Sequence, residues 1–596
     1  MLTPTPTLDS TLARRPADFA TLIEALDYAA QGHRGFNFYS ARGELESVLT
    51  YTDLQSRSQD FARRMIGLDL EFGSRIALIA DTSPEFLAAF FGCQYAGLLP
   101  VPLPLPTSFG GKDGYVDQLN KQMQSCRASA VIGAAAMQDL LAQAAVGLDL
   151  KLVASHDEVA ALPNNDEPLR PQGADDICYL QYSSGSTRFP HGVVISQEAA
   201  VTNCRSNLYQ GVRLQDDDRM MSWLPFYHDM GLVGAMLSLM TGQVSADYLP
   251  TEYFARRPML WLELMSRNKC TMTYSPTFGY ELCARRARPE RIAEFDLSAW
   301  RVAGLGAEMI RADSMREFVN TFGPAGFPAT AFMPSYGLAE CTLAVSFAPT
   351  GQGIEVDIVD EAKLSEERRA VPADPTQTDI KTREVVNCGI PVSDFDLEIR
   401  DDDGNLAPER GIGKIFVRGP SVMSGYYMDP EGTRNVLDDQ GWLDTGDMGY
   451  MLDGSLYIIG RAKDLIILNG RNHWPQDIEW TVEQVDGLRS GDCAAISVPG
   501  HADEEVAMIL VQARISDMDE RRALVAEIKQ RLQKEVGIAC RVTLVKPRSL
   551  PRTSSGKLSR SKARDKYLAG DLEPLESSDP VPWGNADAPL RAAAGQ

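Results

Sequence analysis

Short apolar runs alternate with longer amphipathic segments through the first 330 residues of the chain. Residues 75–80 predict a buried strand, and Ser83, Pro84 and Glu85 then predict the start of a helix, because they offer an N-cap hydroxyl, a first-turn proline and an acid near the positive end of the helix dipole. This rhythm predicts an α/β fold in which helices cover parallel sheets. Further apolar strand runs and the helices after them lie at 130–132, at 220–224 and 230–240, at 271–274 and 277–286, and at 302–305 and 312–321.

The pattern of apolar and polar residues changes near residue 350. Residues 350–386 are charged and proline-bearing without clear periodicity, and we interpret them as an insertion between a helix predicted at 338–347 and a strand predicted at 396–400. Turn-rich segments at 413–419 and 455–459 predict a β-rich subdomain.

The chain is therefore expected to form a large N-terminal domain at 1–460 and a small α/β C-terminal domain at 461–575. The smaller domain contains a helix predicted near 518–534. Residues 576–596 are rich in proline, alanine, serine and aspartate, a composition typical of a disordered tail.

Composition narrows the class of protein. The 596 residues are 44% hydrophobic and 23% charged, which is ordinary for a globular protein, and no apolar run approaches the ~18 residues of a membrane span. The first 19 residues lack a signal-peptide core, so we expect a cytoplasmic protein without stable membrane insertion. The net charge of −23 argues against a general nucleic-acid binder. The ten cysteines and six histidines are scattered, which argues against a structural zinc site.

Basic residues concentrate near the C-terminus. Residues 541–566 hold nine lysines and arginines against one acid, Asp565. The tract fits either an anionic partner or a solvated face.

One loop has the composition of a phosphate-binding site. It follows the apolar run 177–182, which predicts a buried strand. Its backbone N–H groups and hydroxyls are suited to surround phosphate oxygens, with Arg188 as a fixed cation. The spacing differs from the GxxxxGK[ST] loop, and a solvated turn fits it equally well. The loop consists of Ser183, Ser184, Gly185, Ser186 and Thr187.

Seven more unusual segments follow in order, and together with this loop they closely resemble the adenylate-forming superfamily, which includes acyl-CoA synthetases, peptide-synthetase adenylation domains and luciferases. The resemblance runs from about 20 to 570. The insertion and the segments at 227–231, 275–280, 306–308 and 471–477 are most similar to those of fatty acyl-AMP ligases. The seven segments are FYHDMG at 226–231, GLGAE at 304–308, SYGLAECT at 335–342, WLDTGDMG at 442–449, GRAKD at 460–464, NHWPQDIE at 472–479 and PRTSSGK at 551–557.

The resemblance implies a two-step reaction that uses ATP and Mg²⁺. A fatty acid attacks ATP to give acyl-AMP and pyrophosphate, and the phosphopantetheine thiol of an acyl carrier protein then takes the acyl group. No carrier segment follows Lys557, so the carrier is expected to be a separate chain, and its usual acidity suits the basic tract. In the family the insertion is thought to oppose the conformation that uses coenzyme A.

The resemblance also assigns roles around the nucleotide. The loop at 183–187 would hold the β- and γ-phosphates. Arg188 and His191 stand where the family usually has glycine and lysine, so Arg188 is expected to supply the charge that a neutral His191 lacks. Glu340 would bind Mg²⁺, although a lone acid also fits a helix surface. The remaining nucleotide contacts implied are Ser335, Tyr336 and Gly337 at one side of adenine, with Tyr336 stacked on the base; Gly306, Ala307 and Glu308 at its other side; and Asp447 with Arg461 on the ribose.

Lys557 is the implied catalytic residue, because an ammonium group bridging carboxylate and α-phosphate offsets the repulsion between two anions. Without the motif around it, it would be an ordinary surface lysine. His228 would donate a hydrogen bond near the acyl–phosphate junction, although a structural histidine fits almost as well. Lys463 occupies the hinge position, about which the small, mobile C-terminal domain rotates in the family.

The acyl pocket is expected among apolar residues that sequence alone does not separate from ordinary core: Met230, Leu232, Met236 and Phe278. Two rival interpretations remain: an acyl-CoA synthetase on the same scaffold, and a catalytically silent homologue that binds nucleotide or acyl groups. The presence of Lys557, Glu340 and Asp447 argues against the silent homologue.

Overall fold

The computed structural model describes residues 2–106, 111–182, 191–377, 380–468, 471–499, 505–553 and 556–578. Contacts within the chain divide it into two compact units, Met1–Ile459 and Gly460–Gln596. This boundary falls one residue before the one expected from the sequence. None of the helices in the described residues combines the length and the hydrophobicity that crossing a membrane demands.

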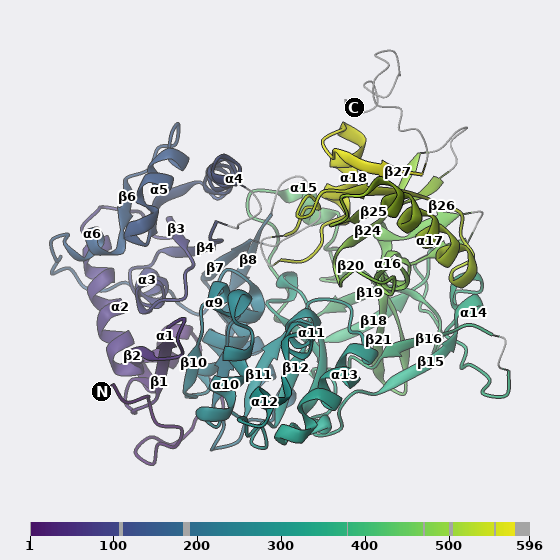
Figure 1. Ribbon diagram of the computed structural model, residues 1–596. Coiled ribbons are helices and arrows are strands. Elements are labelled where there is room, and N and C mark those ends of the chain that lie inside the picture. The colour runs from purple at the N-terminus through teal and green to yellow at the C-terminus, as the bar shows by residue number, and fades with distance from the viewer. Residues whose placement is uncertain are drawn as a thin grey trace. The chain divides into compact units, whose positions relative to one another are not determined.

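A nine-stranded sheet organises the first unit (Figure 1). Its strands from β13 to β1 pair in parallel, and antiparallel strands flank them at both edges. The parallel strands therefore end at one common edge, where α/β sheets bind ligands. In spatial order the strands are β17 (Ile390–Pro391), β14 (Ala344–Phe347), β13 (Phe332–Gly337), β12 (Val302–Leu305), β11 (Met272–Ser275), β9 (Met220–Ser222), β10 (Ala246–Tyr248), β1 (Gly35–Tyr39) and β2 (Leu45–Thr50).

A second, fully parallel sheet has four strands. The helix after its strand β3, α3 (Pro84–Tyr95), begins as predicted, because the Ser83 side chain accepts a hydrogen bond from the Phe86 N–H group and Pro84 occupies the first turn. α2 (Tyr51–Ile66) packs against α3. The parallel α/β fold expected from the sequence is confirmed. The strands in order are β4 (Leu99–Leu103), β3 (Arg75–Ile79), β5 (Ala128–Gly133) and β6 (Leu152–Ser155).

Aromatic residues fill the core beneath the large sheet. Trp261 packs edge-on to Trp300 with ring centroids 5.7 Å apart, and Tyr280 packs edge-on to Phe318 at 5.1 Å. Trp261, Tyr280 and Phe318 come from α10 (Met259–Arg267), α11 (Thr277–Arg286) and α13 (Ala312–Phe322), which Figure 1 shows beside β11 and β12, and Trp300 lies in the segment just before β12. The other helices of this unit's first 330 residues are α1 (Leu22–Ala29), α4 (Gly111–Ser125), α5 (Gln138–Ala144), α6 (His156–Ala160), α7 (Gln197–Ser206), α8 (Ser238–Thr241), α9 (Thr251–Arg256) and α12 (Pro289–Ile292).

The prediction of a helix at 338–347 is wrong. One short helical turn, η6 (Ala339–Cys341), precedes Thr342 at a φ of 67°, and the chain then enters strand β14. A positive φ at a β-branched residue ends any helix, and the buried strand Ala344–Phe347 pairs with β13 and β17 instead.

The segment 350–386 is packed onto the first unit. Its strands β15 and β16 pair antiparallel, and the Asp357 carboxylate accepts hydrogen bonds from Arg410 at 2.9 Å and from the Tyr450 hydroxyl at 2.7 Å. The elements of this region are β15 (Val356–Asp360), α14 (Glu361–Glu366), β16 (Thr382–Val386), α15 (Pro430–Arg434) and the sheet of β18 (Asp396–Arg400), β19 (Gly413–Arg418), β20 (Leu443–Leu452) and β21 (Ser455–Arg461).

The second unit is a small α/β domain around one four-stranded sheet. Its helix α17 (Met518–Glu535) confirms the helix predicted near 518–534. The predicted start of the disordered tail is wrong, because Glu576 and Ser577 belong to β27 (Pro574–Ser577), which pairs with β26. Residues 579–596 lie outside the described residues. The other elements are η7 (Ala462–Asp464), β22 (Ile466–Leu468), β23 (Arg471–His473), α16 (Pro475–Glu483), β24 (Cys493–Pro499), β25 (Glu505–Gln512), β26 (Cys540–Val545) and α18 (Arg560–Ala569).

Candidate active site

The ends of β12 and β13 bring two predicted nucleotide segments together. The Ser335 hydroxyl donates a hydrogen bond to the Leu305 carbonyl at 2.8 Å. A Cβ atom added to Gly306 would lie 3.2 Å from the Ser335 hydroxyl oxygen, closer than an ordinary van der Waals contact, so a glycine suits this position. Segments 306–308 and 335–337 therefore meet where parallel strands end, as a nucleotide site requires.

Tyr336 and Asp447 touch each other. The Tyr336 hydroxyl donates to Asp447 Oδ2 at 2.7 Å. Burial raises the pKa of Tyr336 well above its usual value and the Asp447 carboxylate raises it further, so the phenol keeps its proton and remains a donor. Asp447 itself is 8% exposed. The candidate for adenine stacking and the candidate for ribose binding thus lie side by side, although 111 positions separate them in the chain.

Glu308 has a structural partner in addition to its proposed place beside adenine. Its Oε1 atom accepts a hydrogen bond from the Phe278 N–H group at 2.9 Å, in the first turn of α11. A carboxylate is favourable there because it faces the positive end of the helix dipole. Ala307, just before it, adopts a φ of 70°, which turns the chain sharply after β12.

Glu340 is held in place by a tyrosine. The Tyr426 hydroxyl donates to Glu340 Oε1 at 2.9 Å, and the Glu340 carbonyl accepts from the Met423 N–H group at 2.8 Å. Buried Asn203 fixes the turn after Glu340, since its amide donates to the Ala344 carbonyl at 3.0 Å and its oxygen accepts from the Ala344 N–H group at 3.1 Å. Glu340 is therefore preoriented rather than an arbitrary surface acid.

His191 is linked to the same tyrosine. Its Nδ1 atom lies 2.9 Å from Asp429 Oδ2, and its ring stacks on Tyr426 with centroids 4.6 Å apart. Sequence reasoning missed Tyr426 and Asp429. The only signal was a Ser-Gly-Tyr turn at 424–426, which carries no chemical pattern of its own.

The loop predicted to bind phosphate, Ser183 to Thr187, lies outside the described residues, as does Arg188. The structure does describe the strands on either side of it, β7 (Ile177–Tyr182) and β8 (Gly192–Ser196), which pair antiparallel. The buried strand predicted at 177–182 is confirmed.

His228 pairs with its neighbour in sequence. Its Nδ1 atom lies 2.6 Å from Asp229 Oδ1, and the two side chains are 16% and 12% exposed. The Met230 N–H group donates to the same Nδ1 atom at 3.3 Å. Both contacts of the ring fall on Nδ1, so Nε2 is the ring nitrogen left for a substrate.

The residues proposed for the acyl pocket divide between two hydrophobic clusters. Leu232 and Met236 are fully buried in one cluster, whereas Met230 belongs to the other and Phe278 packs against it. Met230 and Met236 come from η3 (Met230–Leu237), a π-helix, a rare form that is frequent at functional sites. The proposal for an acyl pocket therefore depends mainly on Met230 and Phe278.

In the second unit, Lys557 lies on a loop that closes on itself. The Thr553 N–H group donates to the Lys557 carbonyl at 2.7 Å, and the Lys557 N–H group donates to the Thr553 hydroxyl at 3.2 Å. Gly556 has a φ of 87°, a conformation that favours glycine and sets the turn immediately before the lysine. Lys557 is half-buried.

Much of the basic tract at 541–566 serves the second unit itself. Arg560 pairs with Glu479 at 2.6 Å and with Asp464 at 3.0 Å; burial opposes its charge, but these two acids raise its pKa above the usual value. Arg564 donates to the Ser497 carbonyl at 2.8 Å. Asp464 follows the proposed hinge residue Lys463, which is exposed, as is Arg461 at the end of β21.

Comparison with known proteins identifies the family. Residues 27–427 match the family model described as AMP-binding enzyme, and residues 470–563 match the AMP-binding enzyme C-terminal domain. A protein of Caulobacter vibrioides provisionally named an acyl-CoA synthetase is 48% identical over 96% of this chain and 98% of its own length. A medium-chain-fatty-acid–[acyl-carrier-protein] ligase of Moorena producens is 32% identical over 94% of this chain and 97% of its own length.

A solved structure from work on fatty acyl-adenylate ligases of E. coli and L. pneumophila is 44% identical, with a TM-score of 0.89. The match covers 94% of this chain and 100% of that one. The chain therefore belongs to the AMP-binding enzymes of the adenylate-forming superfamily and resembles their fatty acyl-AMP ligases.

Proposed function

We propose that the protein joins a fatty acid to AMP and then passes the acyl group to a separate acyl carrier protein. In the first step a carboxylate oxygen attacks the α-phosphorus of ATP, and the bond to pyrophosphate breaks. In the second step the phosphopantetheine thiolate attacks the acyl carbon, and AMP leaves with the bonding electron pair. The thiol proton goes to solvent.

The hydrogen bond between Tyr336 and Asp447 is the observation that carries this proposal. It joins an aromatic ring suited to stack on a base with a carboxylate suited to accept both ribose hydroxyls. Gly306 and Ser335 lie at the adjoining strand ends. Such an arrangement fits an adenosine group far better than it fits a hydrophobic core.

The residues present also fit ATP with magnesium. Mg²⁺ bound to a nucleotide needs only one or two protein carboxylates because phosphate oxygens complete its shell, and Tyr426 already orients Glu340. Bound magnesium would offset phosphate charge there. Lys557 would supply the second cation, between carboxylate and α-phosphate, and Lys463 would be the hinge that brings it to the site and removes it.

A second candidate function is acyl-CoA synthesis, which the name of the Caulobacter vibrioides relative favours. The segment 350–386 bears on this choice, because in fatty acyl-AMP ligases it is thought to oppose use of coenzyme A. Hydrogen bonds from Arg410 and Tyr450 to the Asp357 carboxylate anchor that segment to the rest of the first unit. We therefore favour the carrier protein as acceptor.

The test supplies coenzyme A and a holo acyl carrier protein in parallel reactions with ATP, magnesium and a fatty acid. We expect the carrier protein to become acylated on its phosphopantetheine thiol, and we expect little acyl-CoA to form. Asp357→Asn, which weakens the tie, should increase acyl-CoA formation, whereas Asp374→Asn, an exposed aspartate in the same segment, should not. Robust acyl-CoA formation by the unaltered enzyme would overturn the proposed acceptor but not the first step.

A further inference from the structure

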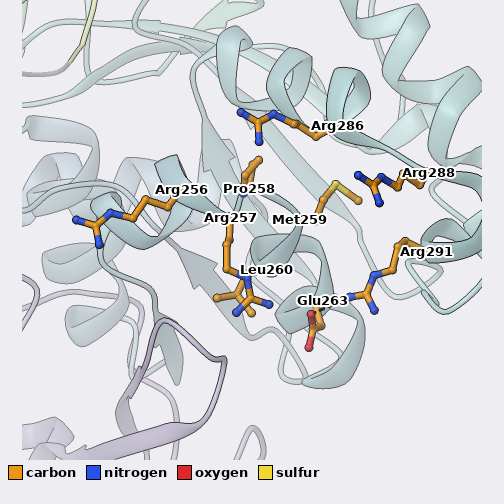
Figure 2. Close-up of a pocket in the computed structure, with 9 residues that line it drawn as sticks. All are labelled: Arg256, Arg257, Pro258, Met259, Leu260, Glu263, Arg286, Arg288 and Arg291. Atoms are coloured by element: carbon orange, nitrogen blue, oxygen red, sulfur yellow. Dashed lines mark hydrogen bonds and ion pairs between the residues drawn. The ribbon is translucent and has the colours of Figure 1, made fainter.

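Arginines surround a pocket in the first unit that no part of the proposed reaction uses. The pocket has a volume of about 430 Å³. Figure 2 shows arginines on both sides of an apolar centre formed by Pro258 and Met259. Its lining consists of Arg256, Arg257, Pro258, Met259, Leu260, Glu263, Arg286, Arg288 and Arg291.

The charge of this region is opposite to that of the molecule. Residues 256–291 contain eight basic and three acidic side chains, in a protein with a net charge of −23. Arg256 and Arg286 end α9 and α11, where the helix dipole favours a cation. The helix dipole accounts for Arg256 and Arg286 taken one at a time. It does not explain why five arginines line one hollow, where like charges repel one another.

The arginines differ in how far the protein neutralises them. Arg291 pairs with Glu263 at 3.2 Å and with Glu294 at 2.6 Å. Arg257 donates to the Ala41 carbonyl at 2.7 Å, and Arg256 lies 3.5 Å from Glu252. Arg286 and Arg288 are exposed and have no hydrogen-bond or ion-pair partner among the described residues.

We propose that this arginine pocket binds the phosphate group of a small anionic ligand. Guanidinium groups present paired N–H donors that match phosphate oxygens, and the pocket contains no lysine, whose single charged point would match less well. Its volume lies in the range of small-molecule sites. Pro258, Met259 and Leu260 offer an apolar floor for the rest of the ligand.

The pocket is separate from the candidate active site. Phe278 near the start of α11 contacts Glu308, whereas Arg286 is the last residue of that helix. Eight residues of helix place them about 12 Å apart along its axis. The inference is therefore independent of the proposed function. The phosphate group can come from a dissolved compound or from a phospholipid headgroup.

The experiment measures two kinds of binding by the full chain. Inorganic phosphate is titrated at low ionic strength, and vesicles of phosphatidylglycerol or of phosphatidylcholine are sedimented with the protein. The double variant Arg286→Glu/Arg288→Glu should bind at least about tenfold more weakly to phosphate, to phosphatidylglycerol vesicles, or to both. A dissolved ligand predicts the first loss, a headgroup the second.

Arg285→Glu is the matched control, because Arg285 is exposed on the same helix but does not line the pocket. It should bind like the unaltered protein. The neutral double variant Arg286→Gln/Arg288→Gln should lose binding as well, and melting temperatures check that each variant is folded. The proposal would be overturned if the unaltered protein bound neither phosphate nor phosphatidylglycerol vesicles. It would also be overturned if the double variant and Arg285→Glu lost binding equally.

Discussion

Tyr336 combines a flat ring with a hydroxyl that orients Asp447. The motif around Tyr336 led us to expect that its ring stacks on adenine. The hydrogen bond to Asp447, 111 positions away, could not be predicted, because nothing in either segment specifies the other as its partner. The same holds for Tyr426 and Glu340. Motifs thus predicted the candidate site residues, and only the fold shows which of them orient one another.

Tyr336→Phe keeps the ring and removes the hydrogen bond to Asp447. Because a hydrogen bond to a charged group contributes about 1.5–3 kcal/mol, the KM for ATP should rise by roughly tenfold or more, and the KM for fatty acid should change little. Steady-state kinetics with each substrate varied in turn measure this. Tyr209→Phe, which removes an unrelated hydroxyl that bonds the Arg15 carbonyl, is the control. An unchanged KM for ATP would remove Tyr336 from the nucleotide site.

Tyr426→Phe tests the proposed magnesium ligand. It removes the hydroxyl that holds Glu340 but keeps the ring that stacks on His191. Loss of one charge-assisted hydrogen bond should raise the magnesium concentration needed for half-maximal activity by about two- to tenfold. Activity is measured against magnesium at fixed ATP. A magnesium dependence identical to that of the unaltered enzyme argues against Glu340 as the ligand.

At the scale of elements, local sequence signals correctly predicted the start of one helix and the positions of several strands. Ser83 and Pro84 predicted the start of α3, and the apolar runs predicted β3, β7, β11 and β12. They failed at 338–347, where Thr342 at a positive φ and the clamp from Asn203 override an apolar pattern that resembles a helix. They also failed at Glu576 and Ser577, which pair with Leu544 and Thr543 of β26 and so form a strand where a tail was expected.

The turn between β3 and α3 gives a pH-dependent stability. Burial raises the pKa of Asp81 from its usual 3.8 to about 6, although the Ser83 hydroxyl that bonds it lowers the pKa in part. Because the folded state binds this proton more tightly than the unfolded chain, the charged carboxylate destabilises the fold above about pH 6. This penalty fades as the pH falls from about 6 to about 4.

Asp81→Asn should therefore stabilise the protein at pH 8 by on the order of 2 kcal/mol and have little effect near pH 4. The amide keeps an acceptor for Ser83, so the start of α3 survives. Melting temperatures of both proteins across this pH range measure the difference. An equal difference at both ends of the range would show that Asp81 titrates normally.

At the scale of the whole molecule, the change in sequence pattern along the chain led us to expect a large and a small domain, and the ordered motifs predicted the superfamily. They could not predict which basic side chains the small unit uses for itself. Arg560 and Arg564 bond within that unit, so a count of positive charges overstates what is left for a partner.

Lys557→Ala tests the role proposed for the smaller unit. Removing a cation that stabilises charge in the transition state should slow adenylation by roughly 10²–10³-fold while nucleotide binding persists. Pyrophosphate release and ATP affinity are measured side by side. Lys562→Ala, an exposed lysine of the same tract, should retain full activity. Unchanged pyrophosphate release by Lys557→Ala would exclude it from the reaction.

The most direct measurement leaves out every thiol acceptor. The purified protein is incubated with ATP, magnesium and a mixture of fatty acids. The products are identified by mass spectrometry, and the released pyrophosphate is assayed in parallel. The account predicts acyl-AMP of at least one chain length together with an equal amount of pyrophosphate. Consumption of ATP to ADP, or no consumption of ATP with any fatty acid, would contradict it.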